Sequence, residues 1–458
     1  MNTDLVIVGG GAAGLMAGAR AGELGMRAVV VERKHNPGRK LLMCGNNRCN
    51  LTSDRSVPDL LSGYGDPVAT FLSPALTAFP PQALRRWFAE RGLETNVHAD
   101  GRVFPASERA DDVLHCLTDT LRDLGVPMVT SCPVTAITRN GEGFTIAADA
   151  ITLTAARVLI ATGGVSYPKT GSVGDGQKWA KALGHRLVPY RPGLAGVEFV
   201  EGWLAPPRDI SIPDVALHVL SGGDVAATLN GEMLLSRRSA RGPCVVNATR
   251  AIARLGLRDF SFTVDLCPQH SAEALLALLT AQVTKGRNTT VGDLVSASRL
   301  PRSLAVDWLR QEMGLRLDGA VRPEDGPLLR RLVDALKSWR PAVRRIRPLK
   351  EAMVTIGGVV LEDVDSATLE SRCCPGLFFA GEVLDVDGPT GGYNLQAAFA
   401  MGRFALASLS HSFGGRVLVT GRSRSPLPKR SPKVRGPSRA GRRRGGNHGT
   451  GRGRRTRR

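Results

Sequence analysis

The sequence predicts an α/β protein that contains a Rossmann-like nucleotide-binding domain, and three observations support this prediction. An apolar run at residues 5–8 leads directly into a glycine-rich turn, as the first strand of a parallel sheet does. A second apolar run, at residues 377–379, leads into another glycine-rich stretch and an alanine-rich helical pattern. The residues between these two regions change from alternating to helical apolar spacing, which indicates further units of a different kind.

The N-terminal motif has the full context of a dinucleotide-binding fingerprint. A predicted strand at residues 4–8 is followed by the Gly-x-Gly-x-x-Gly turn at residues 9–14 and by a predicted helix at residues 12–24. A second predicted strand, at residues 27–31, ends at the acidic residue Glu32. This order of strand, turn, helix, strand and acid predicts that the segment binds a dinucleotide.

Each residue of this motif has its own expected role. Gly9 allows the tight turn, Gly11 lets the backbone approach a pyrophosphate, and Gly14 lets the helix pack closely on the strand. The helix N-terminus stabilises the phosphate charge, and Glu32 is placed to accept hydrogen bonds from ribose hydroxyls. The neighbouring residues expected to contact the cofactor are Ala12, Ala13 and Arg33.

Two later segments favour FAD as the dinucleotide. A predicted strand at residues 156–160 leads into Thr162-Gly163, and the strand at residues 377–379 leads into Gly381-Glu382. The second strand is followed by glycines and by a predicted helix at residues 397–409. A carboxylate at a strand end can bind the ribityl hydroxyls, while a helix N-terminus stabilises negative charge on a reduced flavin ring. The alternative is an ordinary turn and helix cap.

Composition and length limit the class of protein. The chain has 458 residues, enough for two or three domains of about 100–200 residues each. No apolar run approaches the ~18 residues of a membrane helix, and Asp4 lies where a signal peptide would be basic. The eight cysteines form no Cys-x-x-Cys pair, and the histidines form no metal-binding pattern. We therefore expect a cytoplasmic protein without a bound metal and without a membrane partner.

The net charge of +20 is concentrated at the C-terminal end. Residues 415–458 hold 14 Arg, 2 Lys and no acidic residue, whereas the preceding 414 residues hold 45 basic and 41 acidic side chains. We expect residues 412–458 to form a disordered tail, because Arg, Gly, Ser and Pro cannot bury enough apolar surface. The tail is either an arm for non-specific RNA contact or a passive extension, and the lack of stacking aromatics from residue 416 onward favours the extension.

The segment at residues 38–52, which reads GRKLLMCGNNRCNLT, is long enough to be specific. Together with the stretches at residues 101–105, 162–172, 174–176, 352–359 and 381–396, it resembles the BaiN/RdsA-type family of FAD-dependent oxidoreductases, also called aminoacetone-oxidase-like flavoproteins. The resemblance covers roughly residues 1–410, in order, and leaves the tail outside.

The family fold implies that the FAD-binding domain is split in the sequence by an insertion. We expect the following division: first part of the FAD-binding domain at residues 1–188, inserted β-rich unit at 189–270, inserted helical unit at 271–343, second part of the FAD-binding domain at 344–411, and tail at 412–458. Short alternating runs and then leucines at helical spacing agree independently with the two inserted units. Such an insertion commonly covers a flavin and shapes a substrate cleft.

One segment departs from the family pattern. The family usually has a Thr-His pair after the position of Gly231-Glu232, where this chain has Ser236-Arg237. The chain also gains Arg238 and Arg241 close by. A role of the family's histidine in substrate handling would therefore be absent or changed here. The arginines either favour an anionic substrate or form a solvated edge.

The candidates for chemistry lie in the motif segments. Cys49 is a candidate proton donor beside the flavin, although a small buried packing residue is the commoner role of a single cysteine. Tyr393 is the second candidate catalytic residue, and Tyr167 and Lys169 are further candidates for proton transfer or substrate binding. Additional expected cofactor contacts come from Arg39, Lys40, Gly45, Asn46, Gly392, Asn394 and Leu395.

The resemblance implies an NAD(P)H-driven reductase of an activated C=C bond, either a steroid-type enone or an RNA uridine that becomes dihydrouridine. In both reactions the flavin passes hydride to the β-carbon of a conjugated carbonyl, and an acid protonates the α-carbon. The sequence shows no second Gly-x-Gly-x-x-Gly unit for NAD(P)H. Two alternatives stay open: an RNA-associated protein with a structural or redox-sensing flavin, and a flavin-dependent amine oxidase.

Overall fold

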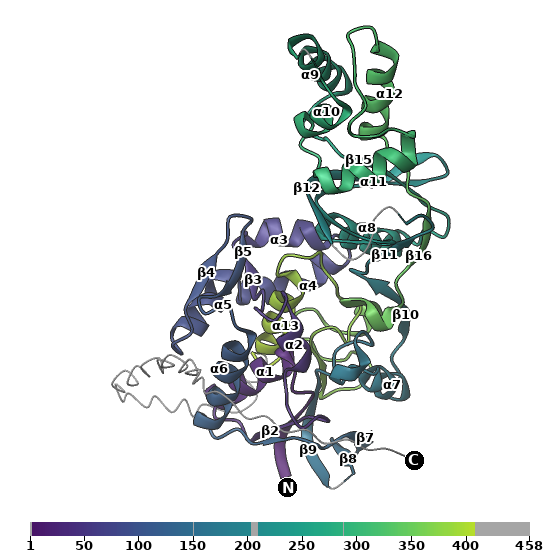
Figure 1. The fold of residues 1–458 in the computed structure, drawn as a ribbon. Helices are drawn as coiled ribbons and strands as arrows, with labels where there is room; N and C mark the ends of the chain where they lie inside the picture. The colour runs from purple at the N-terminus through teal and green to yellow at the C-terminus, as the bar shows by residue number, and fades with distance from the viewer. Residues whose placement is uncertain (1, 150, 203–208, 287, 408–458) are drawn as a thin grey trace, which may run out of the picture. The chain divides into compact units, whose positions relative to one another are not determined.

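The computed structural model describes residues 2–149, 151–202, 209–286 and 288–407 (Figure 1). The expected tail at residues 412–458 lies outside this part of the chain. Among the described residues, no helix is both long and apolar enough to cross a membrane.

A seven-stranded sheet forms the base of the described structure. Its parallel strands are, in spatial order, β6 (Met128–Val129), β2 (Ala28–Val31), β1 (Asn2–Val8), β9 (Thr152–Ile160) and β18 (Leu377–Phe379). Strands β8 (Gly143–Ala148) and β7 (Val134–Asn140) extend it from β9 as an antiparallel pair. The α/β Rossmann-type prediction is therefore confirmed, and the two distant segments that predicted it meet on β9.

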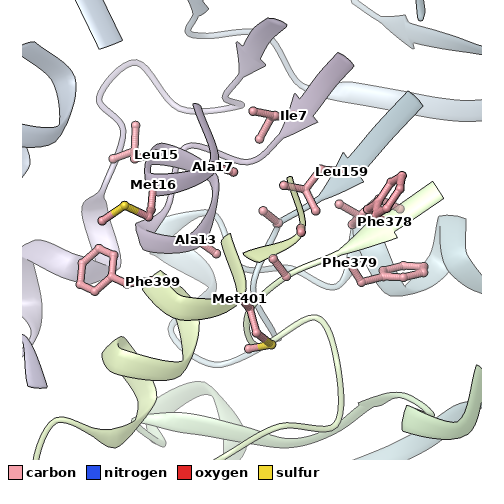
Figure 2. Packing of buried hydrophobic residues seen from close by; sticks show 14 of the residues in the cluster. Ile7, Ala13, Leu15, Met16, Ala17, Leu159, Phe378, Phe379, Phe399 and Met401 are labelled. Carbon is pink, nitrogen blue, oxygen red and sulfur yellow. The ribbon is translucent and has the colours of Figure 1, made fainter. Parts of the chain in front are cut away.

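Helix α1 (Ala12–Glu23) packs on this sheet, and two further helices pack on α1. Helix α1 follows β1, and α13 (Tyr393–Phe404) lies directly against it, while α6 (Ala110–Asp123) also contacts α1. Figure 2 shows side chains of α1 and α13 meeting beside the strands that carry Ile7, Leu159 and Phe378. A Cβ on Gly402 of α13 would lie 2.2 Å from the Ala13 carbonyl oxygen, so a glycine is needed at this contact.

The last described helix begins earlier than the sequence predicts. Helix α13 starts at Tyr393, not at Ala397, because Gly392 adopts a left-handed conformation with φ +97° and turns the chain into the helix there. The predicted contact residues Asn394 and Leu395 therefore lie in the first helical turn and not in a loop. The predicted end at Leu409 lies outside the described residues.

The stretch between β2 and β6 forms a layer of its own that the sequence did not predict in detail. Besides α6, its helices are α2 (Arg39–Met43), α3 (Val57–Tyr64), α4 (Val68–Ala78) and α5 (Pro81–Ala89). Its small antiparallel sheet contains β3 (Thr52–Ser53), β5 (Arg102–Pro105) and β4 (Thr95–Val97). Helix α4 packs on α3 and α13, so this layer shares the core of the large sheet.

The middle of the chain builds a second core. A six-stranded antiparallel sheet contains β15 (Ser261–Asp265), β12 (Ile210–Ser221), β13 (Asp224–Ser236), β14 (Ser239–Arg241), β11 (Val197–Phe199) and β16 (Val343–Ile346). Helix α8 (Pro243–Leu255) packs on this sheet. Helices α9 (Ala272–Lys285), α10 (Val291–Ala297), α11 (Arg302–Met313) and α12 (Gly326–Lys337) follow (Figure 1). The buried hydrophobic residues of these elements form a cluster separate from that of the large sheet.

The two cores are joined by short connecting elements. Strand β10 (Leu187–Gly193) pairs with β17 (Val354–Val359), close to helix α7 (Asp175–Ala182). The described 3-10 turns are at residues 168–170, 349–351 and 361–363. Because β10 pairs with β17 and β16 belongs to the six-stranded sheet, the second core extends roughly from β11 to β16. The domain boundaries proposed from the sequence stay a prediction.

Candidate functional site

A single large cavity collects most of the residues that the sequence singled out. Its volume is about 1180 Å³, which exceeds the roughly 300–1,000 Å³ of a typical small-molecule pocket. Every predicted cofactor-contact residue except Gly14 lines it, and so does Tyr393. Cys49 does not line it. The wall also takes residues from β13, β14 and α8, so both cores contribute to one site.

The glycine turn, residues 9–14 at the junction of β1 and α1, uses glycine in two ways. A Cβ on Gly9, which has φ +113°, would lie 2.4 Å from the Ala161 carbonyl oxygen, and a Cβ on Gly14 would lie 1.9 Å from the Gly9 carbonyl oxygen. These two glycines allow backbone segments to touch. A Cβ on Gly11 would meet no protein atom within 4 Å. Gly11 therefore borders open space inside the cavity.

This open space fits the diphosphate of a dinucleotide. Gly11 is the N-cap of α1, no acidic residue lies in the first turn, and Ala12 and Ala13 also line the cavity. The first N–H groups of a helix have no partner within the helix, and the helix dipole is positive at this end. The backbone at Gly11–Ala13 therefore offers donors to an anion without a side chain in the way.

Glu32 is held by the backbone around it. Its Oε2 accepts a hydrogen bond from the Gly10 amide at 2.7 Å, and its Oε1 accepts one from the Lys34 amide at 2.8 Å. The side chain lines the cavity although the residue is only 8% exposed. A carboxylate offers about four acceptor positions, so ribose hydroxyls can still bind there. The next residue, Arg33, also lines the cavity and pairs with Asp175 at 2.7 Å.

A second group of side chains, the Lys40–Glu382 network, lies in the same cavity wall. Lys40 Nζ contacts Glu382 Oε2 at 2.6 Å and Ser166 Oγ at 2.7 Å. The other Glu382 oxygen accepts a hydrogen bond from the Thr355 amide at 2.6 Å. Lys40 therefore pairs with a carboxylate at the strand-to-helix connection after β18. Arg39, in contrast, is exposed at the cavity and forms no ion pair with any described residue.

The network includes two residues that sequence reasoning missed, Ser166 and Thr355. The Thr355 hydroxyl accepts hydrogen bonds from the amides of Val165 and Ser166, at 2.8 and 3.1 Å. Both residues lie inside family-like segments, at residues 162–172 and 352–359. The two segments could be recognised in the sequence, but the hydrogen bond between Ser166 and Thr355, which are 189 residues apart, could not be predicted from it.

The loop between Cys44 and Asn50 contains four residues with a left-handed backbone. Gly45 has a left-handed backbone, and so do three residues that are not glycine: Asn46, Asn47 and Cys49, with φ between +56° and +64°. Left-handed backbone is rare for side chains other than Asn and Asp. Gly45 and Asn46 line the cavity. Such clusters persist where the surrounding structure fixes them, often next to ligands.

Cys49 itself is fully buried and belongs to the hydrophobic core of the large sheet. Burial, with a smaller contribution from nearby Cys44, raises the pKa of its thiol well above the ordinary value. Cys44 lines the cavity, and burial also raises the pKa of its thiol. This placement favours the packing role of Cys49 over the catalytic one, which stays a prediction.

The glycine-rich connection after β18 closes the cavity next to Tyr393. The Asn394 side chain exchanges hydrogen bonds with the Gly388 backbone at 2.9 and 3.0 Å, which fixes the turn. A Cβ on Gly392 would lie 2.3 Å from the Thr52 backbone. The Tyr393 ring packs edge-on against Tyr64 with a centroid distance of 5.3 Å. Tyr393 is thus a largely buried wall residue, and Asn394 serves the turn.

An ion-pair cluster connects α8 of the second core to the segment before this turn. Asp387 is fully buried, and its two oxygens accept hydrogen bonds from Arg250 Nε at 2.5 Å and Arg254 Nε at 2.6 Å. Arg250 also donates to the Tyr64 carbonyl at 2.7 Å, and Arg254 pairs with Asp385. Removing one partner from a buried ion pair costs about 3–5 kcal/mol. This cluster therefore fixes the cavity wall contributed by α8.

The arginines that depart from the family pattern do not act as a group. Arg241 lines the cavity and pairs with Asp209, whose other oxygen accepts a hydrogen bond from the Ser236 hydroxyl at 2.5 Å. Arg237 and Arg238 do not line the cavity. The structure thus brings one of the three arginines to the site, already paired with a carboxylate.

Fold and site together define the class of protein. The chain is an FAD-dependent oxidoreductase with a Rossmann-type domain, whose glycine turn and Glu32 fit the dinucleotide. The family model described as the HI0933-like protein Rossmann domain matches residues 3–408, and the chain belongs to this family. The resemblance found in the motifs is therefore confirmed.

Curated relatives cover nearly the same region. The chain is 31% identical over 408 residues to the 3-dehydro-bile acid delta(4,6)-reductase of Clostridium scindens, a match that covers 87% of this chain and 97% of that protein. It is 28% identical over 405 residues to the ribosomal RNA dihydrouridine synthase of Escherichia coli, with 87% and 95% covered. Among solved structures, the 3-ketosteroid delta1-dehydrogenase of Sterolibacterium denitrificans matches with 15% identity and a TM-score of 0.48, over 90% of this chain and 100% of that one.

Proposed function

We propose that this oxidoreductase reduces a C=C bond conjugated to a carbonyl, with NAD(P)H as electron donor. One observation carries the proposal: the cavity continues from the glycine turn to the wall formed by the second core. A cofactor held at the turn therefore leaves room for a second molecule beside it. The names of the two curated relatives support the choice of reaction, since both describe the reduction of a C=C bond.

The residues of this chain have separate tasks in the proposed reaction. The amides at Gly11–Ala13 bind the diphosphate and Glu32 binds the ribose of FAD, which when bound supplies hydride chemistry. The Lys40–Glu382 network gives the wall a fixed charge pair. The Arg250–Asp387 cluster holds α8 against the site and so fixes the position of this wall.

Two substrate classes remain as candidates, and the second is favoured by a specific observation. A steroid-type enone corresponds to the bile-acid relative. The wall from the second core contains Asn230, Glu232, Ser239 and Asn247, which can form hydrogen bonds with a polar base. This wall supports an RNA uridine as the substrate, in correspondence with the other relative. A small amine as substrate would instead make the protein an amine oxidase.

The test separates the two half-reactions. Purified protein with bound FAD is mixed anaerobically with NADH or NADPH, and the loss of flavin absorbance is followed. The reduced protein is then mixed with a conjugated steroid enone, with unmodified ribosomal RNA or with a primary amine as control. Reoxidation by either of the first two, with the saturated product found by mass spectrometry, is the expected result. Flavin that no nicotinamide reduces would contradict the proposal and favour a structural or sensing flavin.

A further inference from the structure

Tyr167 has a backbone conformation that tyrosine rarely adopts. It precedes the 3-10 turn at residues 168–170 and has φ +49° and ψ +59°, in the left-handed region. For a bulky side chain this conformation is a clear outlier. Outliers of this kind are retained where the surrounding structure fixes them, and they concentrate at functional sites. Tyr167 lines the cavity, so this outlier lies at the candidate functional site.

Hydrogen bonds on both sides of Tyr167 keep this conformation. On the N-terminal side, the amides of Val165 and Ser166 donate to the Thr355 hydroxyl at 2.8 and 3.1 Å. On the C-terminal side, the amide and the hydroxyl of Thr170 both donate to the Tyr167 carbonyl at 2.8 Å. Ser166 is also part of the Lys40–Glu382 network. The backbone of Tyr167 is therefore anchored one residue away from the fixed charge pair in the cavity wall.

The phenol of Tyr167 is not used by the protein itself. The residue is partly buried, and its hydroxyl has no hydrogen-bond partner among the residues that the structure describes. Tyr64 shows the contrasting case, since it is buried and its hydroxyl donates to the Tyr393 carbonyl at 2.7 Å. A strained tyrosine with an unused hydroxyl at a cavity is thus unlike a tyrosine that serves packing.

Two charged residues accompany Tyr167 in the cavity wall. Arg347 and Glu351 both line the cavity and form an ion pair with an N–O distance of 3.6 Å. Partial burial, together with the nearby Glu351 charge, raises the pKa of the Tyr167 phenol, although Arg347 acts in the opposite direction. The phenol therefore holds its proton at neutral pH, and a positive charge is close by to stabilise the tyrosinate after the proton has left.

We propose that Tyr167 is a catalytic residue whose phenol O–H protonates the α-carbon of the substrate. This inference rests on the proposed function. A hydride supplied by bound, reduced FAD would form the new C–H bond at the β-carbon, the C=C π pair would become the enolate double bond to the carbonyl carbon, and the carbonyl π pair would move to the oxygen. The α-carbon would then take the proton of the Tyr167 O–H, whose bond pair stays on the phenol oxygen; the enolate double bond supplies the electrons of this second C–H bond and the carbonyl re-forms. The resulting tyrosinate takes a proton from solvent water, which reaches this partly exposed residue.

The other candidate proton donors are less suited to this step. Cys49 is fully buried and outside the cavity wall. Tyr393 lines the cavity, but it is only 7% exposed. Its ring packs against Tyr64 and against Gly63, on which a Cβ would lie 2.5 Å from the ring. Tyr167 combines access to the cavity, a free hydroxyl and a fixed position.

The first experiment compares Tyr167→Phe with Tyr190→Phe. Tyr190 is a matched control, because it is 36% exposed and does not line the cavity. In Tyr167→Phe we expect unchanged FAD content, flavin reduction by NAD(P)H within about threefold of wild type, and reoxidation by the enone or RNA acceptor slowed by about 10²-fold. Tyr190→Phe should match wild type in all three measurements.

The second experiment separates proton donation from a structural role. Tyr167→Gly tolerates the left-handed backbone and leaves a hole of the size of the ring. Added phenol should restore much of the reoxidation rate, whereas toluene, which fills the hole without an O–H group, should not. Thermal unfolding of the flavin-free variants provides a readout independent of activity, and both variants should stay folded.

Each outcome decides one hypothesis. If wild type reduces its flavin but no acceptor reoxidises it, the proposed function fails and this inference fails with it. If wild type is reoxidised and Tyr167→Phe is reoxidised within threefold of that rate, only the role of Tyr167 fails. Equal rescue of Tyr167→Gly by phenol and toluene would likewise overturn proton donation, since a filled hole alone would then be sufficient.

Discussion

The glycine turn and the Lys40–Glu382 network lie in one cavity, yet the chain builds them in opposite ways. At the glycine turn, Gly10 and Glu32 are only 22 residues apart, and most of the structure comes from backbone contacts within one strand–helix–strand unit. In the network, Lys40 and Glu382 are 342 residues apart, and side chains make the contacts. The first part depends on the absence of side chains, whereas the second depends on the position of a few of them.

We expect the largest loss of stability from a substitution at Gly14, which packs against the backbone of Gly9. Gly14→Ala would place a Cβ 1.9 Å from the Gly9 carbonyl oxygen, a backbone atom that cannot easily move. We expect a loss of about 3 kcal/mol in the free energy of unfolding, measured by urea denaturation. Gly18→Ala in the same helix is the control, since its Cβ would meet only side chains, at 3.0 Å or more. Equal stability of the two variants would contradict this account.

Gly11→Val should separate cofactor binding from folding at the same turn. A Cβ at Gly11 meets no protein atom within 4 Å, so the protein should fold. The branched side chain would occupy the space of the diphosphate, and FAD affinity should fall at least about 100-fold, or ~2.8 kcal/mol. FAD content after purification and a fluorescence titration measure this effect. Gly326→Val is the control, because Gly326 is equally open but lies at the start of α12. Full FAD content in Gly11→Val would refute the placement of the diphosphate.

Glu32→Gln should change affinity without changing redox behaviour. Its carboxylate accepts two backbone hydrogen bonds, and bonds to charged groups contribute about 1.5–3 kcal/mol. We expect FAD to bind at least about tenfold more weakly. The two-electron reduction potential should move by less than about 30 mV, because Glu32 is expected at the adenosine end of the cofactor. A large potential shift at unchanged affinity would show that Glu32 lies near the flavin ring.

Cys49→Ser tests whether the buried thiol only packs. An unpaired buried hydroxyl costs about 1–3 kcal/mol, so stability should fall while both half-reactions stay near normal. Slowing of the oxidative half-reaction by about 10²-fold would instead support a catalytic role.

The same thiol gives a prediction for pH. Below the ordinary thiol pKa of 9.0, Cys49 is protonated in both the folded and the unfolded chain. Above it, the unfolded chain loses this proton while the folded one keeps it, so the free energy of unfolding falls by up to about 1.4 kcal/mol per pH unit. In Cys49→Ser this decline between pH 9 and 10.5 should be smaller, as measured by urea denaturation at each pH. An identical decline in both proteins would show that Cys49 does not titrate in this way.

Lys40→Met should have the smallest effect on structure and the clearest one on redox behaviour. Glu382 keeps its hydrogen bond from the Thr355 amide, so we expect a stability loss of about 1 kcal/mol at most. Removing the positive charge should disfavour the anionic reduced flavin and lower the reduction potential by about 30 mV, a tenfold change for a two-electron couple. Arg85→Met, a change at a pair outside the cavity, should leave the potential unchanged. An unchanged potential in Lys40→Met would place the network away from the flavin ring.

The sequence alone predicted the parts of the fold whose signals are local. The strand–turn–helix unit at β1 and α1 matches its prediction within one or two residues, because the apolar run and the glycine spacing are set by neighbouring residues. The predicted start of α13 was wrong by four residues, because the helix begins directly after Gly392. The reason for a glycine at this position is its close contact with the Thr52 backbone, which only the folded structure shows. No elements were predicted for the layer between β2 and β6. Its helices α2 to α5 are only 5 to 11 residues long, and helices this short depend on tertiary packing for their stability.

The residue types of the site came from the sequence, and their arrangement came from the tertiary structure. Backbone conformation and periodicity act over a few residues, so the sequence by itself determined the glycine turn, the acid after β2 and the family. The contact of Lys40 with Glu382, the clamp of α8 on Asp387 and the burial of Cys49 depend on segments that meet only after folding. Such contacts leave no periodic signal in the chain, because a single ion pair or a single buried thiol is specified by packing and not by its neighbours in sequence.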